Sequence, residues 1–112
     1  MAKLSTHVLD QASGKPAAGV HIDVFRDGMQ LQTVVTNTDG RTDKPLLEGD
    51  AFTEGAYMLV FHIGDYFDAE EHDDAKRFLD AVPIAFTVDD ATQNYHVPLL
   101  ASPWSYTTYR GS

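Results

Sequence analysis

The chain has 112 residues, of which 43% are hydrophobic and 11% aromatic, and this predicts a single globular domain over residues 1–112. Eight basic and seventeen acidic side chains give a formal net charge of −9, which argues against nucleic acid or anionic lipid as the main partner. No apolar run is long enough to span a membrane, and the first residues contain no apolar signal core, so we expect a cytoplasmic protein. The absence of Cys excludes disulfides, thiolate zinc sites and cysteine nucleophiles.

Apolar and polar residues alternate along most of the chain, a pattern typical of half-buried β-strands. Val20, Ile22 and Val24, for example, share one strand face, while His21 and Asp23 share the other. Short turn sequences containing Gly, Asp or Pro separate the alternating segments. The pattern predicts seven strands, near residues 4–10, 20–26, 30–36, 56–63, 84–88, 93–99 and 104–110. Seven short strands with regular turns favour an all-β sandwich.

One segment departs from this alternation. Between Asp65 and Asp80, steps of three and four residues predict a short helix. Acidic residues lie at its start and basic residues follow, which suits the helix dipole. The positions at helical spacing are Glu71, Ala75, Phe78, Leu79 and Val82.

The same region carries most of the negative charge. Nine acidic and two basic residues lie between Asp65 and Asp90. The run Glu70–Asp74 offers ligands for a hard cation, but a solvated helix face is the commoner role of such a run.

Two histidines are expected on strand faces that point away from the core. His7 alternates with the apolar positions of the first strand, and His96 shares its face with Pro98 and Leu100. An apolar outer face of this kind is poorly solvated in a monomer, so we expect a second subunit to cover it. A single strand histidine is more often a surface or interface residue than a catalyst. A zinc ion held by His7 and His96 stays open, although the sequence offers no third ligand.

Two further features are candidates for ligand binding. Arg41 directly follows the Asp39-Gly40 turn, where it is either an ordinary surface residue or a fixed set of donors for an anionic or carbonyl-rich ligand. At the C-terminus a predicted strand continues almost to the last residue. It therefore leaves Tyr109–Ser112, with its free carboxylate, close to the fold.

Six segments, spread in order over residues 4 to 112, carry a recognisable family pattern. They are Leu4–Asp10, Gly14–Ala17, Thr38–Arg41, Gly64–Phe67, Tyr95–Leu100 and Tyr109–Ser112. Together they resemble 5-hydroxyisourate hydrolase, the enzyme branch of the transthyretin-like proteins. The terminal tetrapeptide is the most specific element, because it separates the hydrolases from the hormone-carrying transthyretins. Residues 70–83 depart most from the pattern, with Val82 where an aromatic commonly precedes the proline.

The resemblance implies a transthyretin-like β-sandwich of seven or eight strands with one short helix. It also implies a homotetramer, assembled as a dimer of dimers, with active sites in the channel between the dimers. The implied reaction is the ring opening of 5-hydroxyisourate, the product of urate oxidation, to 2-oxo-4-hydroxy-4-carboxy-5-ureidoimidazoline. A site of this kind needs no metal and no cofactor.

The family pattern also implies the site residues. One of the two histidines would activate water while the other orients the substrate or moves the proton, and the guanidinium would stabilise negative charge at the carbonyl. The terminal residues would close the pocket. The implied catalytic residues are His7, Arg41, His96 and Ser112, and the implied substrate-binding residues are His7, Arg41, Tyr109 and Arg110.

Two other functions remain open from the sequence. The first is a transthyretin-like carrier that binds an aromatic molecule in the same channel, for which an apolar or Lys-lined channel would be expected. The second is a structural sandwich without chemistry, which would tolerate the loss of the last four residues.

Overall fold

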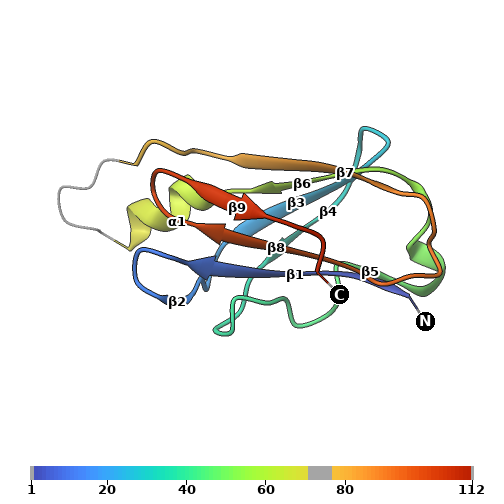
Figure 1. Cartoon of the computed structure of the whole chain (residues 1–112), viewed down its shortest axis with the longest axis horizontal. Helices are drawn as coiled ribbons and strands as arrows, with labels where there is room; N and C mark the ends of the chain where they lie inside the picture. Colours follow the sequence, from blue (N-terminus) through green and yellow to red (C-terminus); the bar gives the residue numbers. More distant parts are fainter. Residues whose placement is uncertain (1, 71–76, 112) are drawn as a thin grey trace.

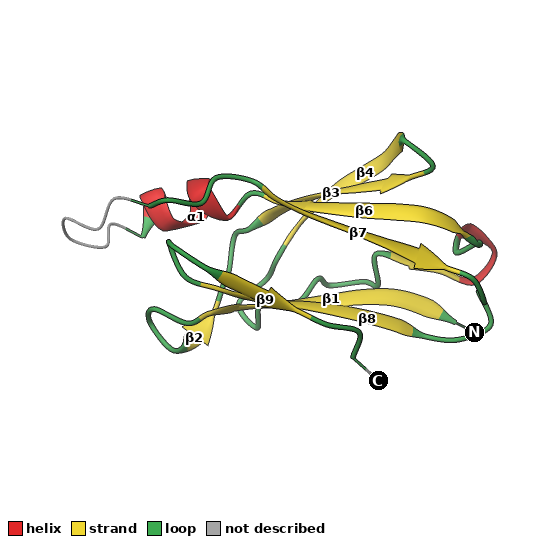
Figure 2. Cartoon of the chain, turned by 45° about the horizontal axis from the view of Figure 1, so that its top comes forward, coloured by secondary structure: helices red, strands yellow, loops and turns green. Residues whose placement is uncertain are grey.

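The computed structural model describes residues 2–70 and 77–111, which form two β-sheets packed face to face, with a short α-helix at one end (Figures 1 and 2). The first sheet consists of β1 (Lys3–Asp10), β2 (Lys15–Pro16), β5 (Leu47–Glu48), β8 (Tyr95–Ala101) and β9 (Tyr106–Thr108). The second consists of β3 (His21–Arg26), β4 (Met29–Val35), β6 (Gly55–Phe61) and β7 (Val82–Val88). The strand orders are β2-β1-β8-β9, with β5 also on β1, and β4-β3-β6-β7. The predicted all-β sandwich is confirmed.

The observed strands extend the prediction at two places and shorten it at one. Each of the seven predicted strands has a counterpart, but β2 and β5 were not predicted, because a two-residue strand contains no alternation to detect. The last strand was expected over residues 104–110 and is limited to Tyr106–Thr108. The residues before it form a turn, in which the Ser102 amide donates to the Ser105 carbonyl at 2.9 Å.

The helix lies earlier than predicted. Helix α1 spans Ile63–Ala69 and buries Ile63, Tyr66 and Phe67, which are spaced as one helical face requires. Residues 77–80, expected to be helical, are not, because the amides of Phe78 and Leu79 donate to the Pro103 carbonyl at 2.9 and 3.0 Å. Val82 begins β7 rather than ending a helix. Residues 71–76, which include the middle of the predicted helix and most of the acidic run Glu70–Asp74, lie outside the described residues.

The feature that matters most for function is the pairing of β1 with β8. These strands are parallel and in continuous register from Leu4–Tyr95 to Asp10–Ala101. Figure 1 shows the pair in the middle of the first sheet, so that the first strand of the chain lies beside a strand near its C-terminal end. Side chains that are directly paired in parallel strands point to the same face, so the outward residues of β1 and β8 form one surface.

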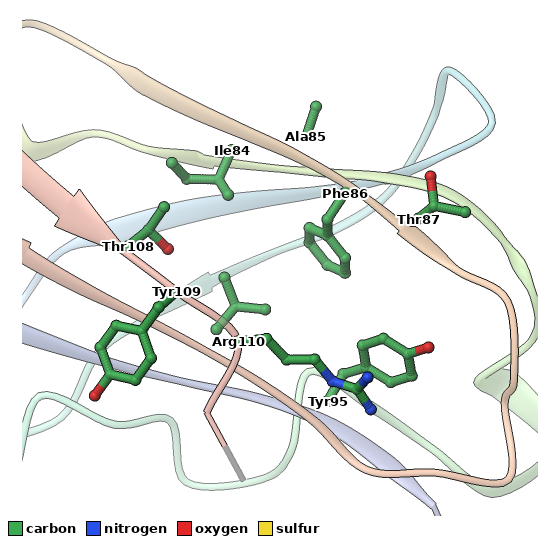
Figure 3. A pocket seen from close by; sticks show the side chains of 9 residues that line it. Ile84, Ala85, Phe86, Thr87, Tyr95, Thr108, Tyr109 and Arg110 are labelled. Atoms are coloured by element: carbon green, nitrogen blue, oxygen red, sulfur yellow. The ribbon is translucent and has the colours of Figure 1, made fainter.

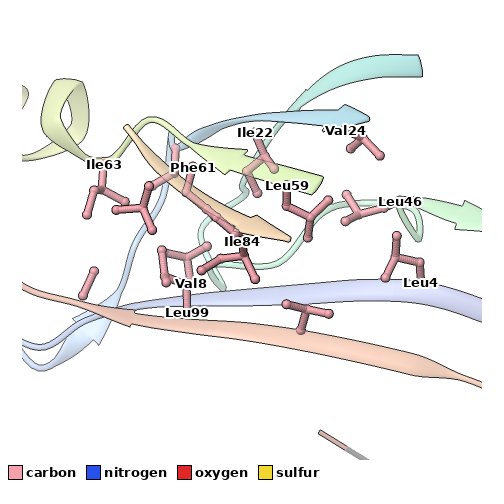
Figure 4. Packing of buried hydrophobic residues seen from close by; sticks show 14 of the residues in the cluster. Leu4, Val8, Ile22, Val24, Leu46, Leu59, Phe61, Ile63, Ile84 and Leu99 are labelled. Atoms are coloured by element: carbon pink, nitrogen blue, oxygen red, sulfur yellow. The ribbon is translucent and has the colours of Figure 1, made fainter. Parts of the chain in front are cut away.

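The core fills the space between the two sheets. It consists of inward-facing aliphatic and aromatic side chains from both sheets. Figure 4 shows Val8 and Leu99 of the first sheet packed against Ile22, Leu59 and Phe61 of the second sheet. All five are no more than 1% exposed. Burial of this extent holds each strand in one register, because a shift by one residue would turn its apolar face to solvent.

One buried polar group ties the end of β1 to the helix. The Asp10 carboxylate is 2% exposed and accepts hydrogen bonds from the Ala12 and Ser13 amides and from the Tyr66 hydroxyl, the last at 2.8 Å. Burial, and then this bond to Asp10, raise the pKa of Tyr66 above its ordinary value. Among the described residues, none of the helices has the length and apolar character needed to cross a membrane.

Candidate active site

The outer face of β1 carries the first predicted site residue. Burial alternates along the strand, with Leu4, Thr6 and Val8 at most 2% exposed, while Ser5 and His7 are partly exposed. His7 therefore points away from the core, as the alternation predicts. Its Nε2 lies 2.9 Å from the carbonyl oxygen of Asp39, which fixes the ring toward the loop after β4.

His96 lies on the same face, one strand across. It is the register partner of Ser5, and its Nδ1 is 2.8 Å from the Ser5 hydroxyl oxygen. Partial burial, then the positive charge of Arg41, then His7 lower the pKa of His96 below its ordinary value. Desolvation and nearby positive charge both disfavour the imidazolium, so His96 is a neutral imidazole near pH 7.

Arg41 reaches this face through a tight loop. The Asn37 side-chain oxygen accepts hydrogen bonds from the Asp39 and Arg41 amides at 2.9 and 3.2 Å. The Val8 amide donates to the Gly40 carbonyl at 2.8 Å. Gly40 has φ of +75°, and a Cβ at this position would lie 2.3 Å from the Val8 carbonyl oxygen. Only glycine permits such a close approach, which holds the loop beside His7.

The C-terminal residues run back along β8 to His96. The Gly111 amide donates to the His96 carbonyl at 2.7 Å, and the two residues form an isolated antiparallel bridge. A Cβ on Gly111 would lie 2.8 Å from Cδ2 of the His96 ring. The glycine of the terminal tetrapeptide is therefore in van der Waals contact with one edge of the imidazole. Ser112, predicted as catalytic, lies outside the described residues.

The Arg110 side chain points to a different part of the surface, whereas the Tyr109 ring points the opposite way (Figure 3). The Arg110 guanidinium lies 3.9 Å from the centre of the Tyr95 ring and donates to the Gln93 side chain at 3.0 Å and to the Asn94 carbonyl at 3.2 Å (Figure 3). Tyr109 and Arg110 line an apolar pocket of about 240 Å³ between β7 and the β8–β9 edge. The structure thus brings His7, Arg41 and His96 together and turns Arg110 away from them.

The sequence left two metal sites open, and one of them, the acidic run Glu70–Asp74, lies mostly outside the described residues. Within residues 2–70 and 77–111, no group of three or more His, Asp or Glu side chains could hold a metal ion. Among these residues, His7 and His96 therefore have no third His, Asp or Glu ligand with which to hold a zinc ion.

The structure adds two contacts that the sequence did not reveal. Ser5 holds Nδ1 of His96, and the Asp39 carbonyl holds Nε2 of His7. The position of Ser5 two residues before His7 places both on one strand face. That spacing is the only signal in the sequence, and it does not identify His96 as the partner.

An all-β sandwich with two histidines and an arginine on the outer face of one sheet fits a transthyretin-like protein. The model of the HIUase/Transthyretin family matches residues 4–111, and the chain belongs to this family.

Comparison with individual proteins shows similarity to both branches of the family, the 5-hydroxyisourate hydrolases and the transthyretins. The chain is 53% identical to 5-hydroxyisourate hydrolase 2 of Rhizobium meliloti, over 98% of this chain and 96% of the relative. The structure of Klebsiella pneumoniae 5-hydroxyisourate hydrolase is 32% identical, with complete coverage of both chains and a TM-score of 0.86. Sea bream transthyretin in complex with thyroxine is 28% identical over 98% of this chain and 95% of its own, with a TM-score of 0.87. The fold is common to both, so the site residues have to distinguish a hydrolase from a carrier.

Proposed function

We propose that this chain hydrolyses 5-hydroxyisourate by opening its six-membered ring. The relative with 53% identity is named a 5-hydroxyisourate hydrolase, whereas the transthyretin is 28% identical, which favours the enzyme over the carrier. The observation that carries the proposal is the environment of His96. A neutral imidazole beside a guanidinium and a second imidazole is equipped for proton transfer next to a developing negative charge.

The reaction consumes one water molecule. Water adds to a ring carbonyl and forms a C–O bond, the adjacent C–N bond breaks, and the carbonyl carbon becomes a carboxylic acid, which releases its proton to solvent near pH 7. The proton taken from the water is transferred to the departing nitrogen. A catalyst must therefore accept a proton, stabilise the negative oxygen of the tetrahedral intermediate and return the proton.

The residues of the outer face match these three tasks. One of His7 and His96 accepts the proton from water, and the other delivers a proton to the nitrogen. The Arg41 guanidinium stabilises the oxyanion. The C-terminal backbone borders the site through Gly111, which lies against His96.

The test follows the ultraviolet absorbance of 5-hydroxyisourate, generated from urate by urate oxidase. The purified chain is expected to accelerate the decay of this absorbance, and the acceleration should be proportional to its concentration. An unchanged decay rate with correctly folded protein, together with saturable binding of aromatic ligands, would favour the carrier instead.

We also propose that the active assembly is a homotetramer, a dimer of dimers. In support, β7 and β9 lie at the edges of their sheets, and the large side chains of Trp104, Tyr106 and Tyr109 are exposed by 54%, 42% and 58%. Light scattering should give a mass four times the 12.4 kDa of the chain, and a monomer at enzymatic concentrations would contradict the assembly.

A further inference from the structure

The two histidines of the outer face are each held through one ring nitrogen, and by different partners. A carbonyl oxygen can only accept a hydrogen bond, so the contact between His7 Nε2 and the Asp39 carbonyl requires a proton on Nε2. Neutral His7 therefore has its free lone pair on Nδ1. His96 is held at the opposite nitrogen, Nδ1, by the hydroxyl of Ser5.

The backbone imposes the contact between Ser5 and His96. The two residues are 91 positions apart in the chain but are direct partners in the continuous register of β1 and β8. Both side chains leave the same face of the sheet, from strands about 4.8 Å apart. The hydroxyl and the ring consequently meet without rearrangement of either strand.

A second contact holds the other edge of the ring. Gly111 lies so close to His96 that a Cβ would come within 2.8 Å of Cδ2 and 3.3 Å of the His96 Cβ. The ring therefore has the Ser5 hydroxyl at Nδ1 and the terminal backbone at its Cδ2 edge. Nε2 is the ring nitrogen that these two contacts leave for a ligand.

We infer that Ser5 is a positioning residue, whose hydroxyl holds the His96 ring so that Nε2 is the atom that exchanges a proton with the substrate. This inference rests on the proposed hydrolase function. Ser5 acts through His96 and does not touch the reacting atoms. With His7 presenting Nδ1 and His96 presenting Nε2, the two imidazoles offer defined and different atoms to the same ligand.

The experiment compares Ser5→Ala, which removes the hydroxyl, with Ser5→Thr, which keeps it on a side chain suited to a strand. Thr53→Ala is the matched control, because it removes an exposed hydroxyl from the loop before β6. The first readout is the ¹⁵N resonance of the His96 ring nitrogens, assigned by their loss in His96→Gln. We expect the Nδ1 resonance to shift in Ser5→Ala and to stay near its wild-type position in Ser5→Thr and Thr53→Ala.

The second readout is turnover of 5-hydroxyisourate. Loss of one hydrogen bond to a proton-transferring ring should lower kcat about tenfold in Ser5→Ala, with KM changed less than about twofold. Ser5→Thr should restore kcat to within about threefold of wild type, and Thr53→Ala should leave it unchanged. If Ser5→Ala does not fold, Ser5→Cys replaces it, because a thiol is a weak hydrogen-bond partner of similar size.

The outcomes separate this inference from the proposed function. If the wild-type chain does not accelerate the decay, the proposed function fails, and an unshifted Nδ1 resonance in Ser5→Ala would independently overturn the contact. If the wild type is active and Ser5→Ala keeps both its kcat and the wild-type resonance, the positioning role is wrong. Equal loss of kcat in Ser5→Ala and Ser5→Thr, with an unchanged ring spectrum, would also overturn it, since that pattern reflects general damage to the strand.

Discussion

The outer faces of the two sheets carry similar residues with different partners. On the second sheet, the Thr33 hydroxyl donates to the Asp23 carboxylate at 2.6 Å, and Nε2 of His62, just after β6, lies 2.8 Å from the same carboxylate. On the first sheet, His96 faces a serine hydroxyl and lies near Arg41. The bond from Thr33, followed by that from His62, lowers the pKa of Asp23, whereas burial, Arg41 and His7 lower the pKa of His96.

The comparison shows that the partner, rather than the histidine itself, decides what the residue can do. On the second face the imidazole of His62 is held by a carboxylate, and the pair is a structural contact between Asp23 and His62. On the first face, burial and the nearby Arg41 guanidinium favour the neutral ring of His96, which can accept a proton near pH 7. His62, between β6 and α1, is therefore expected to contribute to stability, and His96, on β8, to catalysis.

The largest expected difference in activity between the two faces appears when one imidazole is deleted from each. His96→Ala should lower kcat/KM for 5-hydroxyisourate by at least about a hundredfold, and so should Arg41→Ala, since each removes a group that acts on the reacting atoms. His62→Ala should stay within about twofold of wild type. Initial rates at equal concentrations of folded protein measure all three. A loss in His62→Ala as large as that in His96→Ala would contradict the functional difference between the two faces.

Giving the first face the partner found on the second should sharpen the comparison. In Ser5→Asp, the new carboxylate should raise the pKa of His96, opposing the effects of burial, Arg41 and His7 that lower it. In the wild type, kcat/KM plotted against pH should fall only when the pH drops below the ordinary pKa of a histidine. In the variant this fall should begin about one pH unit higher.

The measurement is stopped-flow mixing of freshly made 5-hydroxyisourate into buffers from about pH 5 to about pH 9, the range over which a histidine titrates. Ser5→Ala is the matched control, because it removes the hydroxyl without adding charge. A fall that begins at the wild-type pH in Ser5→Asp would show that the side chain at position 5 does not act on His96.

Much of the fold could be predicted from alternation alone, because long half-buried strands repeat their pattern several times. The errors arise where a pattern is too short or has two interpretations. The pairs Lys15–Pro16 and Leu47–Glu48 are too short to alternate. Ile63 continues the alternation of Phe61 and also begins the buried helical face with Tyr66, so the sequence allowed either assignment.

The sequence predicted which face of its strand each histidine of the candidate site lies on, but not that the two histidines lie close together. Alternation places His7 and His96 on outer faces, but their proximity depends on a parallel pairing between strands at opposite ends of the chain. The role of Ser5 depends on the same register. Arg110 was predicted to bind substrate, but its guanidinium instead contacts the Tyr95 ring and the Gln93 side chain. These are tertiary contacts that no local sequence pattern encodes.

The smallest expected effect tests the second face. Asp23→Asn removes the charge that the bonds to Thr33 and His62 stabilise, in a site where the carboxylate is 23% exposed. It should lower the free energy of unfolding by about 1 kcal/mol near pH 7, the usual scale of one such interaction. Turnover should stay within about twofold of wild type.

The pH dependence of this stability difference has a defined sign. Because folding lowers the pKa of Asp23, the unfolded chain binds the proton more readily, and the stabilisation is complete above the ordinary carboxyl pKa. It is lost as the pH falls through the lowered value. Urea unfolding of wild type and Asp23→Asn should therefore differ near pH 7 and converge below about pH 4. Curves that stay equally separated at low pH would mean that Asp23 stabilises the sheet through its shape and not its charge.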